Sequence, residues 1–164
     1  MLPSLIQNQD GLFETTGGPV PFKEIILGLK EAMATKFNAK LKISNPSDAR
    51  DYFYTNLVNE EQEIFSVMFL DNQHRFISYE RLFFGTINAT QVHPRIVVKR
   101  ALELNAACVI VGHNHPSGLS TESLSDIDIT ATLKKALNLI DVALIDHVIV
   151  AGSGVTSLAE LGKI

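Results

Sequence analysis

The chain has 164 residues, of which 46% are apolar and 20% charged, as expected for one globular domain with a short extension. Fourteen basic and eighteen acidic residues give a net charge of −4, which excludes a generally basic surface that coats nucleic acid. A single cysteine, Cys108, excludes an internal disulfide and fits a reducing compartment. No apolar run approaches the roughly 20 residues of a membrane-spanning helix, so we expect a soluble cytoplasmic protein with no membrane association.

Residues 1–41 are expected to form an N-terminal extension with one helix. Turn and linker signals occupy the first twenty residues. A helix is predicted over residues 21–37, because apolar residues recur at helical spacing after Pro21, which suits a first turn. A second, short helix is expected after the Asn45-Pro46-Ser47 break, with Ser47 as its capping residue.

Residues 42–164 are expected to form one α/β domain. Runs of β-forming residues predict a strand at 63–70 and a returning strand at 75–82, joined by a turn. The pattern then predicts, in order, a helix over 94–104, a buried strand over 107–111, a helix over 123–137 and a buried strand over 142–150. This alternation predicts a sheet that is covered by helices and partly parallel, and the leading hairpin makes it mixed.

Two histidines and an aspartate carry the strongest chemical signal. His113 and His115 stand two residues apart at the end of a predicted strand, so both imidazoles project from the same face. Asp126 follows eleven residues later, in the first turn of a helix that can fold back beside the strand end. Two imidazole nitrogens and one carboxylate oxygen leave the fourth tetrahedral position open, as in a catalytic zinc site; structural sites usually close it with a protein ligand.

Several of these residues also have structural interpretations. Ser123-x-x-Asp126 is a plausible helix N-cap, and a cap and a metal ligand can coexist at a helix N-terminus. Asp146 and His147 interrupt an apolar strand, so one of them needs a buried partner. Support of a metal site and a satisfied core pair both remain open for this pair.

The spacing His-x-His, seven residues, Ser, two residues, Asp is the JAMM signature of JAB/MPN-domain metalloproteases, and it is met by His113, His115, Ser123 and Asp126. The chain resembles the RadC-like branch of that superfamily from about residue 43 to its end. The further matching strings are His113-Asn114-His115-Pro116-Ser117-Gly118, Gly85-Thr86-Ile87-Asn88, Val92-His93-Pro94-Arg95 and Asp146-His147.

The resemblance implies a three-layer αβα domain of the JAB/MPN type, which is cytidine-deaminase-like and has a mixed central sheet flanked by helices. It also implies one zinc ion per chain, bound by His113, His115 and Asp126.

The resemblance further implies a glutamate near a metal-activated water. Glu63, at the start of a β-rich run, matches best, and Glu60, Glu61 and Glu80 are the alternatives. Glu63 would move the proton of the water and the Ser123 hydroxyl would stabilise the oxyanion. The expected activity is that of a zinc metallopeptidase acting on a peptide or isopeptide bond of a protein or peptide substrate.

The chain also departs from the family pattern. The leading 40 residues do not resemble the helix-hairpin-helix module of longer RadC-like proteins, and Ile96 follows Arg95 where an acidic residue is usual. The alternative function is therefore a non-catalytic or DNA-repair-associated binding module that keeps the fold. Basic residues on two predicted helices could contact nucleic acid, although solvated helix faces commonly carry such charges.

Overall fold

The computed structural model describes residues 5–7, 13–15, 21, 23, 25–28, 42–85, 91–152 and 154–164. The chain divides into two compact units, Met1–Ala39 and Lys40–Ile164. In the first unit, strands β1 (Leu5–Gln7) and β2 (Phe13–Thr15) pair antiparallel, and residues 23 and 25–28 are helical. The two short strands were not predicted, and residues 29–37 of the predicted helix lie outside the described residues.

A five-stranded mixed sheet forms the centre of the second unit, in the spatial order β4-β3-β5-β6-β7. The pairing of β5 with β6 is parallel, whereas the other three pairings are antiparallel. The predicted hairpin and the mixed sheet are thus confirmed, and only the short last strand was missed. The strands are β3 (Ile64–Leu70), β4 (Phe76–Phe84), β5 (Cys108–Asn114), β6 (Ala143–Ala151) and β7 (Gly154–Ser157).

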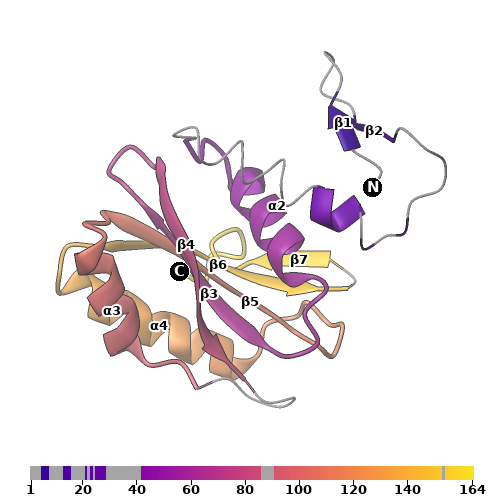
Figure 1. Cartoon of the computed structure of the whole chain (residues 1–164). Helices are drawn as coiled ribbons and strands as arrows, with labels where there is room; N and C mark the ends of the chain where they lie inside the picture. The colour runs from indigo at the N-terminus through magenta and orange to yellow at the C-terminus, as the bar shows by residue number, and fades with distance from the viewer. Residues whose placement is uncertain are drawn as a thin grey trace. The chain divides into compact units, whose positions relative to one another are not determined.

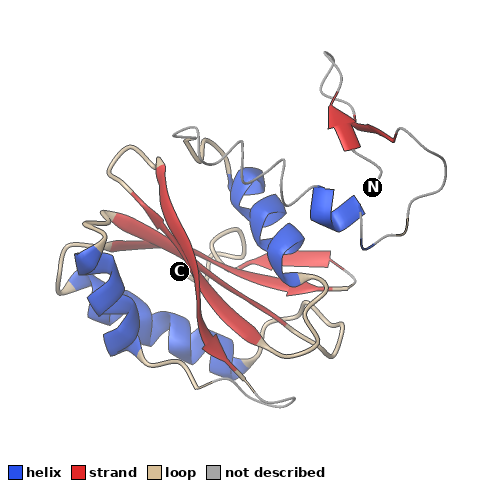
Figure 2. Ribbon diagram, in the orientation of Figure 1, coloured by secondary structure: helices blue, strands red, loops and turns tan. Residues whose placement is uncertain are grey.

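Helices cover both faces of this sheet, which confirms the three-layer αβα architecture (Figures 1 and 2). Helix α2 (Pro46–Leu57) packs on β5, β6 and β7, while α3 (Pro94–Glu103) and α4 (Leu124–Asn138) pack together on the opposite face. In the described part of the chain, none of the helices is long and apolar enough to cross a membrane.

The cap of α2 differs from the prediction. Asn45, not Ser47, is the N-cap: its side chain accepts a hydrogen bond from the Asp48 backbone N–H at 3.0 Å, and the Asp48 carboxylate accepts from the backbone N–H of Asn45. Pro46 occupies the first helical position, where its fixed φ suits the helix and its missing N–H costs nothing. Ser47 therefore lies inside the first turn, where its hydroxyl donates to Asn45.

Strands β3 and β5 are buried on both faces, as is typical of a sheet between two helical layers. On the face toward α3 and α4, alternate side chains such as Phe65, Val67 and Val111 form the apolar core with both helices. Strand β6 carries a register shift here: Val109 pairs with Leu144, but Ile110 pairs with Asp146, so one residue of β6 is extra. The carboxyl ends of parallel β5 and β6 meet at the edge where β3 begins.

Gly112 lets helix α2 lie directly on β5. A Cβ atom on Gly112 would stand 2.4 and 2.7 Å from two ring carbons of Phe53, and 3.0 Å from the carbonyl oxygen of Val148. Phe53 is fully buried, so its ring has little room to move.

We predict that Gly112→Ala lowers the free energy of unfolding by about 1–3 kcal/mol through overpacking, measured by urea denaturation. Gly152→Ala is the matched control, because a Cβ there would meet nothing within 4 Å. An equal loss in both variants would show that the contact with Phe53 is not the cause.

Candidate metal centre

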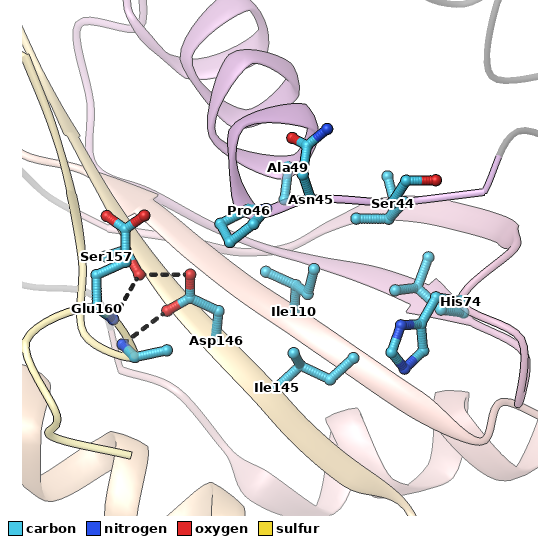
Figure 3. A pocket seen from close by; sticks show the side chains of 13 residues that line it. Ser44, Asn45, Pro46, Ala49, His74, Ile110, Ile145, Asp146, Ser157 and Glu160 are labelled. Atoms are coloured by element: carbon cyan, nitrogen blue, oxygen red, sulfur yellow. Dashed lines mark hydrogen bonds between the residues drawn. The ribbon is translucent and has the colours of Figure 1, made fainter.

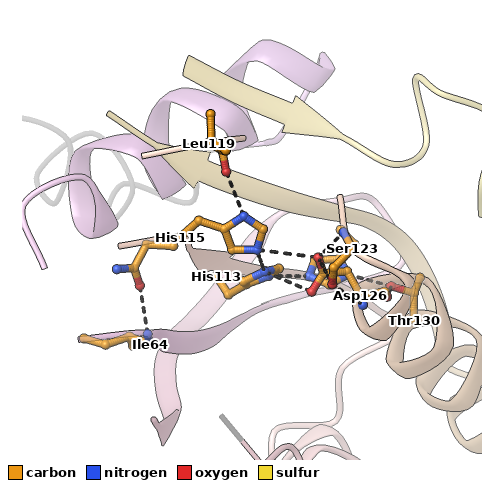
Figure 4. A network of polar contacts seen from close by, with 9 residues as sticks. Ile64, His113, His115, Leu119, Ser123, Asp126 and Thr130 are labelled. Carbon is orange, nitrogen blue, oxygen red and sulfur yellow. Dashed lines mark hydrogen bonds and ion pairs between the residues drawn. The ribbon is translucent and has the colours of Figure 1, made fainter. Parts of the chain in front are cut away.

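Three ligand-type side chains converge where β5 ends and α4 begins (Figure 4). His113 Nε2 lies 2.9 Å from His115 Nε2 and 3.2 Å from Asp126 Oδ1, and His115 Nε2 lies 3.5 Å from Asp126 Oδ2. His113 ends up buried inside the strand, whereas His115 follows the strand and is held by its backbone N–H, which donates to Val150 O at 2.8 Å. The structure therefore brings together the three predicted ligands.

The N-terminus of α4 orients Asp126. Ser123 is the N-cap, because its hydroxyl oxygen accepts from the Asp126 N–H at 3.1 Å. In return, Asp126 Oδ2 accepts from the Ser123 N–H and hydroxyl, both at 2.7 Å. Oδ2 is thereby occupied and Oδ1 remains directed at His113. The capping interpretation is confirmed, and the same hydrogen bonds aim the carboxylate at the two imidazoles.

His115 is held in the orientation that a metal ligand needs. Its Nδ1 lies 2.8 Å from the carbonyl oxygen of Leu119. Because a carbonyl only accepts, Nδ1 must carry a proton, so in the neutral ring Nε2 presents a lone pair to Asp126 and His113. Such a hydrogen bond on the far side of the ring is the usual support of a metal-binding histidine.

The charges in this cluster complement one another. Burial would raise the pKa of Asp126, but its close contacts with the imidazoles of His113 and His115 outweigh this effect and hold that pKa well below its usual range. The Asp126 carboxylate, which accepts a hydrogen bond from the protonated His115 ring, in turn raises the pKa of His115. A carboxylate therefore stays ionised beside an imidazole that favours a proton. Two nitrogens and one oxygen are a donor set that fits a zinc ion, which would replace that proton.

A cleft of about 590 Å³ opens onto these groups. Glu63 and Ser123, the two predicted catalytic residues, both line it, so the structure places them beside the three ligands. Its remaining walls are apolar or uncharged, and the described lining includes no lysine or arginine. They comprise Phe65, Gln91, Val92, Ser125 and Ile129.

The other candidate glutamates lie outside the described lining of this cleft. Glu60 pairs with Arg81 at 2.9 Å and, with Glu61, borders a separate surface hollow. Glu80 pairs with Arg100 at 2.5 Å, and this hydrogen bond lowers the pKa of Glu80. Glu63 is therefore the one of the four that lies where a base could act.

Asn114 fixes the segment that carries Glu63, a role that the sequence did not indicate. Its side-chain oxygen accepts from the Ile64 N–H at 2.8 Å, and its amide nitrogen donates to the carbonyl oxygens of Glu60 and Gln62 at 3.1 and 2.9 Å. Asn114 is buried and stands between the two histidines in sequence. The start of β3 is thus tied to the strand end that bears the candidate ligands.

Asp146 and His147 point to opposite faces of the sheet, and each has buried partners. On the α2 face, Asp146 accepts from the Ser157 hydroxyl at 2.7 Å and the Ala159 N–H at 3.0 Å, beside a mainly apolar cavity of about 230 Å³ (Figure 3). On the α4 face, His147 Nε2 lies 2.8 Å from His113 Nδ1. Asp146 thus has buried hydrogen-bond partners of its own, and His147 contacts one of the three candidate ligands.

Thr130 is a polar contact that the sequence did not reveal, because its position counted only toward the apolar spacing of the helix. Its hydroxyl lies 2.6 Å from His147 Nδ1 and donates to the backbone oxygen of Asp126. Burial lowers the pKa of His147 well below its ordinary value, so this ring is neutral.

The matches to known proteins agree with this architecture. The family model described as RadC-like JAB domain matches residues 43–163, and the chain belongs to this RadC-like JAB family. A UPF0758 protein of Pseudomonas syringae pv. tomato is 47% identical over 148 residues, covering 88% of this chain and 66% of the relative. A UPF0758 protein of Xylella fastidiosa is 49% identical over 150 residues, covering 82% of this chain and 67% of the relative. A UPF0758 protein of Cellvibrio japonicus is 51% identical over 120 residues, covering 73% of this chain and 54% of the relative. The chain thus spans about two thirds of the length of the first of these relatives, and their names state no activity.

We predict that the purified protein binds about one zinc ion per chain, measured by metal analysis after dialysis. His113→Ala and Asp126→Ala should each lose the ion, because each removes one of the three candidate donors found among the described residues. His93→Ala is the control, since His93 is exposed and makes no side-chain capping bond. Retention of zinc by both ligand variants would contradict this site.

We also predict that zinc affinity falls on acidification. The metal-free pKa of His115 is raised, so a proton competes for this ring below that raised value, whereas Asp126 stays ionised. The dissociation constant should be constant at high pH and increase as the pH falls through the raised pKa, by about tenfold per pH unit for one competing proton. Equal affinities at pH 8 and pH 5.5 would contradict the assignment.

Proposed function

We propose that this chain is a zinc-dependent hydrolase that cleaves a peptide or isopeptide bond. The observation that carries the proposal is the arrangement of three convergent donors with an additional carboxylate, Glu63, in the same cleft. His113, His115 and Asp126 would hold the ion, which would supply a water of lowered pKa and polarise the scissile carbonyl. Membership of the RadC-like JAB family supports the same reaction class.

Glu63 is proposed to move the proton. As a carboxylate immediately before β3, it would take a proton from the attacking water and deliver it to the leaving amine. Asn114 holds the backbone on both sides of Glu63, so the carboxylate starts from a fixed position. Such fixed placement is what efficient proton transfer requires, because the distance must match a hydrogen bond.

Ser123 is proposed to stabilise the developing oxyanion. Its hydroxyl donates to Asp126 Oδ2, but that oxygen also receives the Ser123 N–H. The hydroxyl can therefore turn toward substrate while the backbone N–H continues to orient Asp126. Ser123 is exposed and lines the cleft, so no rearrangement of the helix is needed for this donation.

The lining of the cleft favours an uncharged amide as substrate. No lysine or arginine occurs among the described lining residues, and phosphate groups are normally bound by such side chains. Phe65, Val92 and Ile129 offer apolar walls for side chains next to the scissile bond. We therefore favour a peptide or protein substrate over a nucleic acid.

We predict that Glu63→Gln retains about one zinc per chain but loses hydrolysis by about 10²–10⁴-fold, because proton transfer is lost while the metal donors remain. The measurement uses a panel of quenched fluorogenic peptides and isopeptide-linked conjugates with the zinc-loaded protein. Glu61→Gln is the matched control, since Glu61 is exposed and absent from the described lining of this cleft.

Two results would contradict the proposal. One is a zinc-loaded wild-type protein that cleaves no member of the panel, and the other is full activity in Glu63→Gln. Salt-dependent retention of DNA by a zinc-free His113→Ala variant, together with no hydrolysis by the wild type, would favour the binding-module alternative.

A further inference from the structure

A buried chain of polar contacts connects the backbone of α4 to the back of the His113 ring. The Thr130 hydroxyl donates to the Asp126 carbonyl and lies 2.6 Å from His147 Nδ1. His147 Nε2 in turn lies 2.8 Å from His113 Nδ1. At most 2% of the surface of Thr130, His147 or His113 is exposed, so these three side chains are shielded from bulk solvent. We call this series of groups the relay.

The relay has one assignment of protons that satisfies every contact. The Asp126 carbonyl only accepts, so the single proton of the Thr130 hydroxyl is committed to it. At the next contact Thr130 Oγ1 must accept, which requires the proton of His147 to sit on Nδ1. A second proton would create a fully buried cation whose hydrogen-bond contacts are a hydroxyl and an imidazole, at a high desolvation cost.

The ring nitrogen that carries the proton of His147 then determines which nitrogen carries the proton of His113. With its proton on Nδ1, His147 presents a bare Nε2, which accepts from His113 Nδ1. A neutral His113 with a proton on Nδ1 has a lone pair on Nε2, and Nε2 is the atom that faces Asp126 and His115. Only this tautomer can bind a cation in the cluster, because a protonated Nε2 has no lone pair.

We propose that Thr130 and His147 are positioning residues that hold the proton of His113 on Nδ1 and so keep Nε2 ready for the metal. The inference rests on the proposed zinc site and adds to it two residues that touch neither substrate nor ion. Asp126 and Thr130 stand one turn apart on α4, and His147 lies beside β5 in the parallel register. One helix thus supplies both a ligand and the end of the relay.

Removing the Thr130 hydroxyl should reverse the direction of the hydrogen bond between His147 and His113. In Thr130→Val, His147 Nδ1–H would face a methyl group, and an unsatisfied buried donor costs about 1–3 kcal/mol. The alternative tautomer of His147, protonated on Nε2, avoids that cost by donating to His113 Nδ1. His113 must then carry its proton on Nε2, where it excludes the ion. The effect would reach the metal through two imidazole rings without changing any ligand.

The test compares zinc affinity in four proteins by competition with a chromophoric chelator. Thr130→Val should bind zinc about 10–100-fold more weakly than wild type, the usual cost of losing such support. Thr130→Ser keeps the hydroxyl and should stay within a few-fold of wild type. Thr132→Val is the matched control, because the Thr132 hydroxyl also donates to the carbonyl four residues earlier on α4, but at an exposed position.

A second readout uses the metal-free protein and needs no activity. Long-range ¹H–¹⁵N spectra of the imidazole rings should show wild-type His113 protonated on Nδ1, and Thr130→Val should shift protons toward Nε2 of His113 and His147. A wild-type His113 protonated on Nε2 would overturn the inference even if Thr130→Val fails to fold. So would wild-type affinity in a folded Thr130→Val.

These outcomes are separable from failure of the proposed function. A wild-type protein that binds no zinc would overturn the zinc site, and with it the role of the relay. Zinc bound equally by wild type and Thr130→Val would leave the proposed hydrolase intact and overturn only the inference.

Discussion

Asp126 satisfies two demands at once, and the candidate centre depends on this. One carboxylate oxygen accepts the hydrogen bonds that begin α4, and the other faces a buried imidazole on β5. Ser123 and Asp126 close the cap where α4 begins, and the cap places the carboxylate against the strand end. The same hydrogen bonds therefore stabilise the start of the helix and set the geometry of the cluster. A change that loosens the cap would also misdirect the ligand.

The rest of the fold brings the remaining groups to this point. Parallel pairing of β5 and β6 places His147 opposite Val111, from where its ring reaches His113 on the same face. Antiparallel pairing with β3 brings the segment of Glu63 to the same edge. Asn114 completes the arrangement by clamping that segment from within the strand that carries His113. Three strands and one helix thus each contribute one part, and the sheet between the two helical layers keeps their spacing fixed.

Much of this could be predicted from local pattern. The period of two along a strand placed His113 and His115 together, and the start of an amphipathic helix located Asp126. Glu63 could be favoured only through the resemblance to the family, which implies a glutamate where a β-rich run begins. The sequence also predicted the hairpin and the mixed sheet, because turn residues and burial patterns are local signals.

The errors and omissions have physical reasons of their own. Asn45 and Ser47 are both good capping residues, and the choice fell to Asn45 because Pro46 can occupy the first helical position. Thr130 could not be recognised as polar support, since its partner is 17 residues away and reaches it only through the register of β6. Asn114 was overlooked for a similar reason, because its partners lie 50 or more residues earlier.

The register shift in β6 has a consequence for the chemistry of the centre. Leu144 and His147 are three residues apart, yet both lie on the face toward α4, which uninterrupted alternation would forbid. In a perfectly regular β6 that kept Leu144 opposite Val109, Asp146 would take the place of His147 opposite Val111. A carboxylate there would bring a second negative charge behind the ligand and could not pass a hydrogen bond along as an imidazole does. The one extra residue in β6 thus determines which side chain contacts the candidate ligand His113.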